Sequence, residues 1–115
     1  MRMTEIDFGA QIPVDGYGPG FFRIGGHVMS GDLLILPTGP EPWDGSWDAV
    51  FAAKDAFDVL FIGMGEEIAP LGAEDSDALK AAGVAHDVMA TAAACRTYNV
   101  LLSEGRRVAA ALRAV

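Results

Sequence analysis

Two runs of consecutive apolar residues are the clearest structural signals in this chain. Residues 33–36 read LLIL and residues 59–62 read VLFI, and neither run contains a polar residue. Runs of this length are typical of strands that are covered on both faces. We expect the first strand to end at Pro37 and the second to lead directly into a Gly-Met-Gly turn at residues 63–65.

A helical repeat appears later in the chain, where apolar residues recur at i, i+4, i+7 and i+8. These residues are Ala94, Tyr98, Leu101 and Leu102. The spacing predicts a helix from Ala92 to Glu104 that turns this stripe toward the core. Thr91 is the expected N-cap and Gly105 the expected stop, because glycine adopts the left-handed conformation beyond a helix end without a Cβ clash.

The first half of the chain predicts short strands. Residues 5–18 alternate weakly and are interrupted by glycine and proline, which is typical of strands at a sheet edge. Phe21–Met29 and Asp32–Pro37 flank Ser30-Gly31, and this spacing predicts a hairpin with a two-residue turn. Residues 38–45 read TGPEPWDG and predict an ordered loop.

The second half predicts an alternation of helices and strands. A short helix is expected from Ser46 or Asp48 to about Asp55, and another from Asp75 to Ala82. A strand at Val84–Val88 would then pair in parallel with Val59–Ile62, since the two are joined by a helix. The final segment, RRVAAALRAV, is ambiguous because its alanines favour a helix, but no second cap is present, and we expect a strand.

These elements together predict an α/β fold in one domain that spans residues 1–115. Its mixed β-sheets would contain a hairpin and a pair of parallel strands, packed with two to three helices and completed by a closing C-terminal strand.

Charge and composition narrow the possible partners. The net charge is −8, which disfavours nucleic acid and anionic membrane surfaces. The charge is uneven, since residues 1–95 carry a net −11 and residues 96–115 a net +3, so the C-terminal part can face an acidic partner. A single cysteine excludes an internal disulfide, and the start of the chain does not read as a signal or transit peptide. No apolar run approaches the ~20 residues that span a bilayer, and a cytoplasmic location is expected.

The candidate catalytic and ligand-binding residues are expected in or near the predicted long helix. Cys95 would be a nucleophile if the helix N-terminus and the neighbouring arginine lowered its pKa, and otherwise a buried small side chain. Gly63 and Gly65 would form either a tight turn or one wall of a cleft for a small molecule, with the helix start at Thr91 as the other wall.

Arg96 and Asn99 are three residues apart and share the polar face of the same helix. An arginine fork beside an amide would bind a carboxylate of a ligand or partner. Alternatively, Arg96 would pair with Asp87 or Glu104 within the molecule. The two histidines, His27 and His86, lie far apart in the sequence, and no cysteine or carboxylate joins either at ligand spacing, so no metal site is expected. No cofactor is expected either.

Several stretches resemble a small family of unknown function that includes a mitochondrial respiratory complex I assembly factor and an adipogenesis-associated protein. The matching residues are Gly16-Tyr17-Gly18, Phe22, Gly31, Gly63, Gly65 and the run Met89–Leu112, within which Arg96, Tyr98-Asn99, Leu101, Glu104 and Arg106-Arg107 fit the family pattern. The resemblance implies an α/β domain of mixed sheets, in which residues 107–115 form the closing strand.

Two functions are therefore considered. The resemblance implies an accessory or assembly-type protein that binds a protein partner, with a link to respiratory or membrane-complex assembly, and we favour this function. The family resemblance does not imply an enzyme. The alternative is a small-molecule-binding domain or enzyme with its cleft at Gly63–Gly65 and the helix start near Thr91. A homo-oligomer is compatible with either function.

Overall fold

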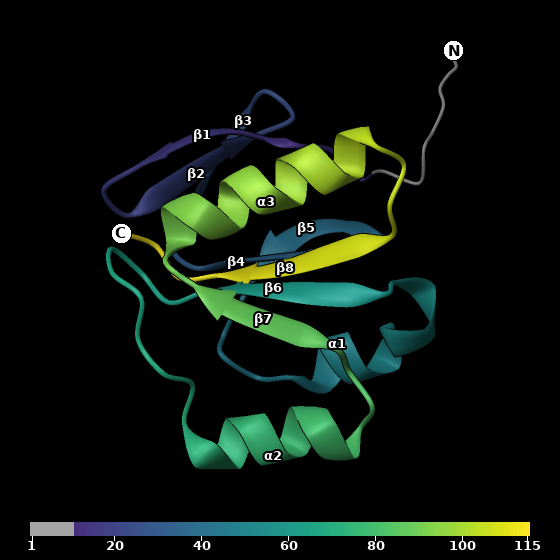
Figure 1. Cartoon of the computed structure of the whole chain (residues 1–115). Coiled ribbons are helices and arrows are strands. Elements are labelled where there is room, and N and C mark those ends of the chain that lie inside the picture. The colour runs from purple at the N-terminus through teal and green to yellow at the C-terminus, as the bar shows by residue number, and fades with distance from the viewer. Residues whose placement is uncertain (1–10) are drawn as a thin grey trace.

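The two apolar runs form strands of one five-stranded sheet. They are β4 (Leu33–Leu36) and β6 (Val59–Gly63), and all four residues of β4 are buried. Between them lies β8 (Val108–Leu112), which is antiparallel to β4 and parallel to β6. The order across the sheet is β5-β4-β8-β6-β7 (Figure 1). The structure is a computed structural model and describes residues 11–115.

The central position of β8 explains its composition. All five of its residues are buried, and three of them are alanines. Both faces of the strand are covered: Ala110 faces the core beneath α3 (Thr91–Ser103), and Ala109 and Ala111 face the opposite core. The helix α3 packs across β8 and β6. The predicted C-terminal strand is thus confirmed, and burial overrides the helical propensity of its alanines.

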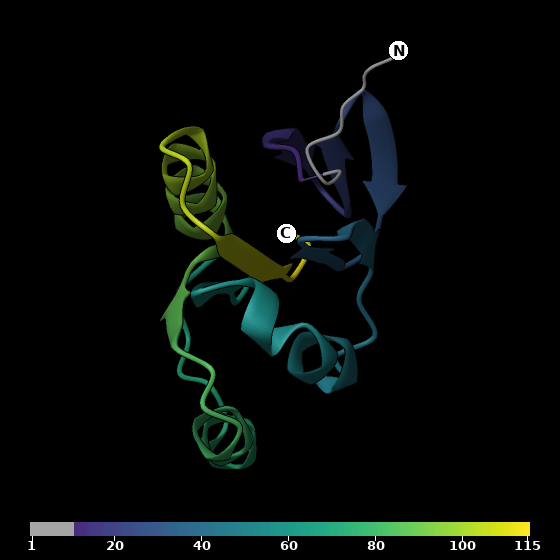
Figure 2. The same ribbon diagram turned by 90° about the vertical axis from the view of Figure 1, so that its right-hand side faces the viewer.

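The sheet separates two hydrophobic cores, and this explains the continuous apolar runs. In β4, Leu33 and Ile35 belong to the core beneath α3, whereas Leu34 and Leu36 belong to the opposite core. The opposite core is covered by α1 (Asp48–Ala52), a 3-10 turn η1 (Lys54–Ala56) and α2 (Ala73–Ala81). Figure 2 shows α3 on one side of the central sheet and the shorter helices on the other. A strand with a core on each face needs apolar residues at every position.

A three-stranded antiparallel sheet lies beside α3 on the same side of the central sheet (Figure 2). Its strands are β1 (Val14–Gly18), β2 (Phe21–Ile24) and β3 (His27–Ser30). The predicted hairpin turn at Ser30-Gly31 is wrong, because the turn lies at Gly25-Gly26 and joins β2 to β3. Both glycines have positive φ, as the tight hairpin turn between right-twisted strands requires. The predicted edge-strand residues 5–10 lie outside the described residues.

The loop predicted at residues 38–45 is also partly wrong. Gly39–Pro42 form β5, which pairs with β4 as the outer strand of the central sheet. The two prolines in β5 hid the strand in the sequence, since proline is tolerated only where a strand has a free edge. Trp43, which follows β5, is buried.

The remaining elements agree with the sequence in type and differ by a few residues at their ends. The strand β7 (His86–Met89) pairs in parallel with β6, as expected from the helix that joins them. The two earlier helices, α1 and α2, begin and end within a few residues of the predicted limits. Helix ends fray, so their boundaries are the weakest part of a sequence-based prediction.

The helix α3 holds the small sheet by two side chains on its inner side. Asn99 accepts a hydrogen bond from the Val14 N–H and donates one to the Val14 carbonyl, both at 2.8 Å. The Tyr98 hydroxyl donates to the carbonyl of Ile12 at 3.0 Å, and its ring is fully buried. These bonds connect segments about 85 positions apart in the sequence.

Asn99→Ala should release the start of β1 from α3. Loss of both hydrogen bonds to Val14 is expected to lower the free energy of unfolding by about 1–2 kcal/mol and to speed exchange of the Val14 amide at least about tenfold. Chemical denaturation and amide exchange measured by NMR test this. The matched control is Ser103→Ala, since the Ser103 hydroxyl donates only to Val100 in its own helix. Equal exchange at Val14 in Asn99→Ala and wild type would contradict the anchoring role.

Candidate functional site

Thr91 joins three segments of the chain. Its side chain is fully buried, and its hydroxyl accepts a hydrogen bond from the Gly65 N–H at 2.9 Å and donates to the Arg113 carbonyl at 2.8 Å. The Thr91 N–H in turn donates to the Gly65 carbonyl at 2.8 Å. Thr91 is therefore not the N-cap, which is Ala90, but the first residue of α3. Its hydroxyl binds neighbouring segments and makes no capping bond within the helix.

The two candidate glycines lie directly against Thr91. A Cβ added to Gly63 would stand 2.8 Å from the Thr91 hydroxyl oxygen and 2.9 Å from the Thr91 Cα. Gly65 has a φ of +110°, a conformation that other residues rarely adopt. The space predicted as a cleft between this turn and the helix start is filled by the Thr91 side chain. The sequence predicted that the Gly63–Gly65 turn and Thr91 lie close together, but not that they are in direct contact.

Cys95 is buried on the inner side of α3. Burial raises the pKa of its thiol from 9.0 to about 11, so the thiol is protonated at neutral pH. His86, the base nearest to it in sequence, places its Nδ1 atom 2.9 Å from the carbonyl of Val84. A nucleophilic cysteine needs a lowered pKa and solvent access, and this environment supplies neither.

Arg96 and Asn99 do not act as a pair. Asn99 is engaged with β1, whereas the Arg96 side chain is exposed to solvent. Among residues 11–115, the salt bridges are Arg107–Asp58 at 3.0 Å and Arg113–Asp32 at 3.9 Å, so the predicted internal partners Asp87 and Glu104 do not bind Arg96.

The outer side of α3 forms a shallow hollow of about 330 Å³, here called the α3 patch. It is lined by Arg96, Thr97, Val100 and Leu101. Val100 is 51% exposed and leaves apolar surface on the outer side of the helix. The patch combines an exposed cation with exposed apolar surface, a composition suited to protein contacts.

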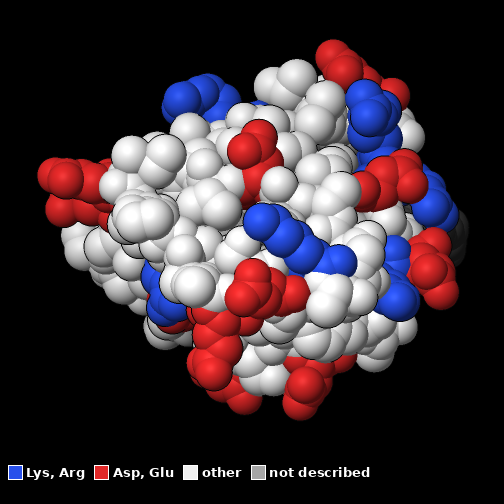
Figure 3. All heavy atoms as spheres, turned by 60° about the horizontal axis from the view of Figure 1, so that its bottom comes forward, with Lys and Arg blue, Asp and Glu red and all other residues white. Residues whose placement is uncertain are grey.

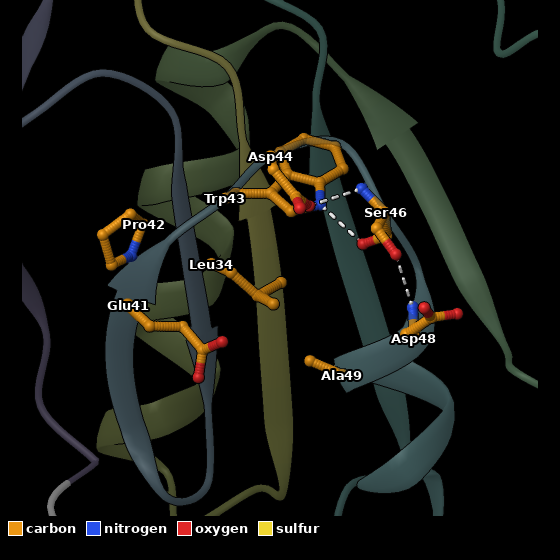
Figure 4. A pocket seen from close by; sticks show the side chains of 8 residues that line it. All are labelled: Leu34, Glu41, Pro42, Trp43, Asp44, Ser46, Asp48 and Ala49. Atoms are coloured by element: carbon orange, nitrogen blue, oxygen red, sulfur yellow. Dashed lines mark hydrogen bonds between the residues drawn. The ribbon is translucent and has the colours of Figure 1, made fainter.

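A second hollow, of about 350 Å³, lies around Trp43 and was not anticipated from the sequence (Figure 4). Its polar groups bond to one another: the Trp43 indole N–H donates to the Ser46 carbonyl, the Ser46 N–H to Asp44, and the Asp48 N–H to the Ser46 hydroxyl. The guanidinium carbon of Arg113 lies 5.3 Å from the Trp43 ring centroid. These contacts shape the loop between β5 and α1.

The ionisable side chains of the described residues do not form a metal centre. Within the described part of the chain, no three His, Cys, Asp or Glu side chains come close enough to share a metal ion. On the face covered by α1 and α2, acidic side chains gather in several places, with basic ones between some of them (Figure 3). No helix in residues 11–115 has the length and apolarity needed to span a bilayer.

Thr91→Val should destabilise the contacts of Thr91 with Gly65 and Arg113 while preserving the shape of the side chain. The change leaves the Gly65 N–H and the Arg113 carbonyl without their partner and is expected to cost about 2–3 kcal/mol. Thr97→Val, on the exposed side of the same helix, is the matched control and should change stability by less than about 0.5 kcal/mol. Urea denaturation measures both. If the two variants were equally stable, the Thr91 hydroxyl would not hold this junction.

The buried thiol predicts a loss of stability in alkali. Between about pH 9 and pH 11 the unfolded chain has lost the Cys95 proton while the folded protein retains it, so the free energy of unfolding falls as pH rises. The loss is about 1–3 kcal/mol across this window. Burial also raises the pKa of Tyr98, to about 12, which adds a further loss above pH 10.

Cys95→Ala tests the raised pKa of the Cys95 thiol, and the measurement is the free energy of unfolding as a function of pH. The variant should be less stable at pH 7, because a buried side chain is truncated, yet should lose less stability between pH 8 and pH 10.5 than the wild type. Parallel slopes for the two proteins would contradict a raised pKa at Cys95.

Comparison with known proteins gives consistent matches along the chain. Residues 14–113 match the model of a family described as a protein of unknown function, DUF498/DUF598. An uncharacterized protein of Rhodobacter capsulatus is 50% identical over 114 residues, which cover 97% of this chain and 92% of that protein. The zebrafish (Danio rerio) protein named NADH dehydrogenase (ubiquinone) 1 alpha subcomplex assembly factor 3 is 34% identical over 97% of this chain and 70% of its own length.

Solved structures share the fold. A crystal structure described as an outer membrane protein from Bartonella henselae has a TM-score of 0.86 and 36% identity, covering 95% of this chain and 99% of that one. An NMR structure of a Rhodopseudomonas palustris protein has a TM-score of 0.77 and 36% identity over 97% of this chain and 90% of that one. The family model spans nearly all of the described residues, and the relatives include the complex I assembly factor expected from the sequence. The chain therefore belongs to the DUF498/DUF598 family of proteins of unknown function.

Proposed function

We propose that this protein is an assembly-type accessory factor that binds a partner protein through the α3 patch, and that the partner belongs to a respiratory complex. The observation that carries the proposal is the exposed Val100 beside the exposed Arg96 on a helix whose inner side is fully engaged. The zebrafish relative supports the respiratory part, because it is named as an assembly factor of NADH dehydrogenase.

The contacts of α3 make its outer side a rigid platform. Thr91 anchors the start of the helix to two loops, and Asn99 ties its middle to β1. Ala94 and Tyr98 are fully buried against the central sheet. Because these contacts fix the helix, it loses little conformational freedom when its outer side binds a partner, and this favours association.

The chemistry of the patch defines what it would recognise. Arg96 presents a planar guanidinium that binds a carboxylate with two parallel hydrogen bonds. Val100 and the partly buried Leu101 supply apolar surface next to it. A partner segment with an acidic residue adjoining an apolar one, such as one face of an amphipathic helix, would fit this surface.

The other candidate residues weigh against the small-molecule alternative. Thr91 fills the space between Gly63 and the helix start, and the Cys95 thiol is buried and protonated. Both features favour a structural role for these residues. The cytoplasmic location expected from the sequence stays a prediction.

The proposal is tested in the cells from which the protein comes. Disrupting the gene should lower NADH:ubiquinone oxidoreductase activity in isolated membranes, and a plasmid copy of the wild type should restore it. Val100→Asp should restore about tenfold less, because it places a carboxylate within the apolar part of the patch. Native gels of the membranes show whether the assembled complex falls in parallel.

The matched control is Ile68→Asp, which introduces the same charge at an apolar side chain that is 69% exposed on the loop after β6. It should restore activity as the wild type does. Both variants should keep the wild-type melting temperature, since both positions are at the surface. Unchanged activity after gene disruption would refute the respiratory role, and full rescue by Val100→Asp would refute the α3 patch as the binding surface.

A further inference from the structure

The strand edges of this protein are protected to different degrees. In the central sheet, the Trp43 N–H donates to the Asp32 carbonyl, so alternation places the backbone of residues 40 and 42 toward the free edge of β5. Both positions are proline, and proline has no N–H. This edge therefore offers no outward donor at either position and does not template another strand.

The outer edge of β1 is protected in another way. Both backbone groups of Val14 are bonded to the side chain of Asn99, so the helix α3 occupies the start of this edge. A register irregularity between Val14 and Gly16 also interrupts the ladder there. Bulges of this kind are a common means of ending strand pairing at an edge.

The outer edge of β3 has none of these protections. The Gly31 N–H donates to the Gly20 carbonyl, and β3 pairs with β2 from His27 to Ser30. Alternation therefore turns the backbone N–H and C=O groups of Val28 and Ser30 away from β2, and no residue in 11–115 bonds to them. Figure 2 shows β3, in dark blue, at the outer margin of the small sheet with no described element beyond it.

The surroundings of this edge suit a second copy of the same chain. β3 itself carries no Asp, Glu, Lys or Arg, and the two acidic residues that flank this segment are both engaged: Asp15 accepts from the Gly26 N–H and Asp32 from the Ala114 N–H. The Val28 side chain on β3 is 55% exposed. Two copies that approach through β3 therefore bring together neutral backbone edges and apolar side chains, although the whole molecules repel one another.

We propose that the protein forms a two-fold symmetric dimer in which β3 pairs antiparallel with β3 of a second copy. A register centred on Met29 places Val28 opposite Ser30 of the second copy, and these are the residues with outward backbone groups. The two small sheets become one six-stranded sheet, and the symmetry satisfies the edge of each copy with the same residues.

Sedimentation equilibrium of the full chain across a wide range of concentration tests the dimer. The wild type should show a mass of two chains at high concentration. Val28→Lys should weaken self-association by about tenfold or more, because two lysines enter each dimer at the pairing edge. The matched control is Ile68→Lys, which adds the same charge at another exposed apolar position and should dimerise as the wild type does.

Amide hydrogen exchange on the wild type gives a second measurement that does not depend on the folding of a variant. Exchange at Val28 and Ser30 should slow as the concentration rises, whereas exchange at Val100 should not change. A wild type that stays at the 12.1 kDa mass of one chain at every concentration would overturn the proposal. So would a Val28→Lys variant that dimerises normally, an Ile68→Lys variant that does not dimerise, or concentration-independent exchange at Val28 and Ser30.

Discussion

The insertion of β8 between β4 and β6 is the constraint on which the rest of the structure depends. β8 joins these two apolar strands into one sheet, since β4 pairs with one of its edges and β6 with the other. The central sheet is thus completed only by the last strand of the chain, which has both faces buried. Both cores of the protein contain residues of β8, so loss of this strand would remove packing from each of them.

The helix α3 converts this sheet into a two-sided scaffold. Its inner side uses Thr91 to join the ends of β6 and β8, and Asn99 to hold β1 of the small sheet. Residues that looked like candidates for chemistry in the sequence therefore turn out to connect distant segments. The part of the helix that remains available is its outer side, where Arg96 and Val100 are exposed.

The two proposed interfaces differ in physical character. The α3 patch offers side-chain chemistry on a rigid helix, whereas the edge of β3 offers backbone hydrogen bonds. They belong to different elements, the helix α3 and the outermost strand of the small sheet (Figure 1). One interface can therefore be disabled by a point substitution without changing the residues of the other.

By itself the sequence determined the fold class, the buried strands β4 and β6, their helical connections and the helix α3. These features follow from local periodicity, because a strand with two covered faces and an amphipathic helix each leave a pattern in consecutive residues. The family was also recognisable, and its resemblance resolved the ambiguous final segment as a strand.

Only the tertiary structure decided the turn at Gly25-Gly26, the strand hidden by Pro40 and Pro42, and the burial of Thr91 and Cys95. Each depends on a neighbour distant in the sequence. Two glycine-containing turns, at Gly25-Gly26 and at Gly31, lie between β2 and β4. A proline-rich segment is a strand only where another strand lies on one side of it. A threonine at a helix start either caps its own helix or bonds to other segments, depending on what packs against it. Local sequence patterns do not contain that information.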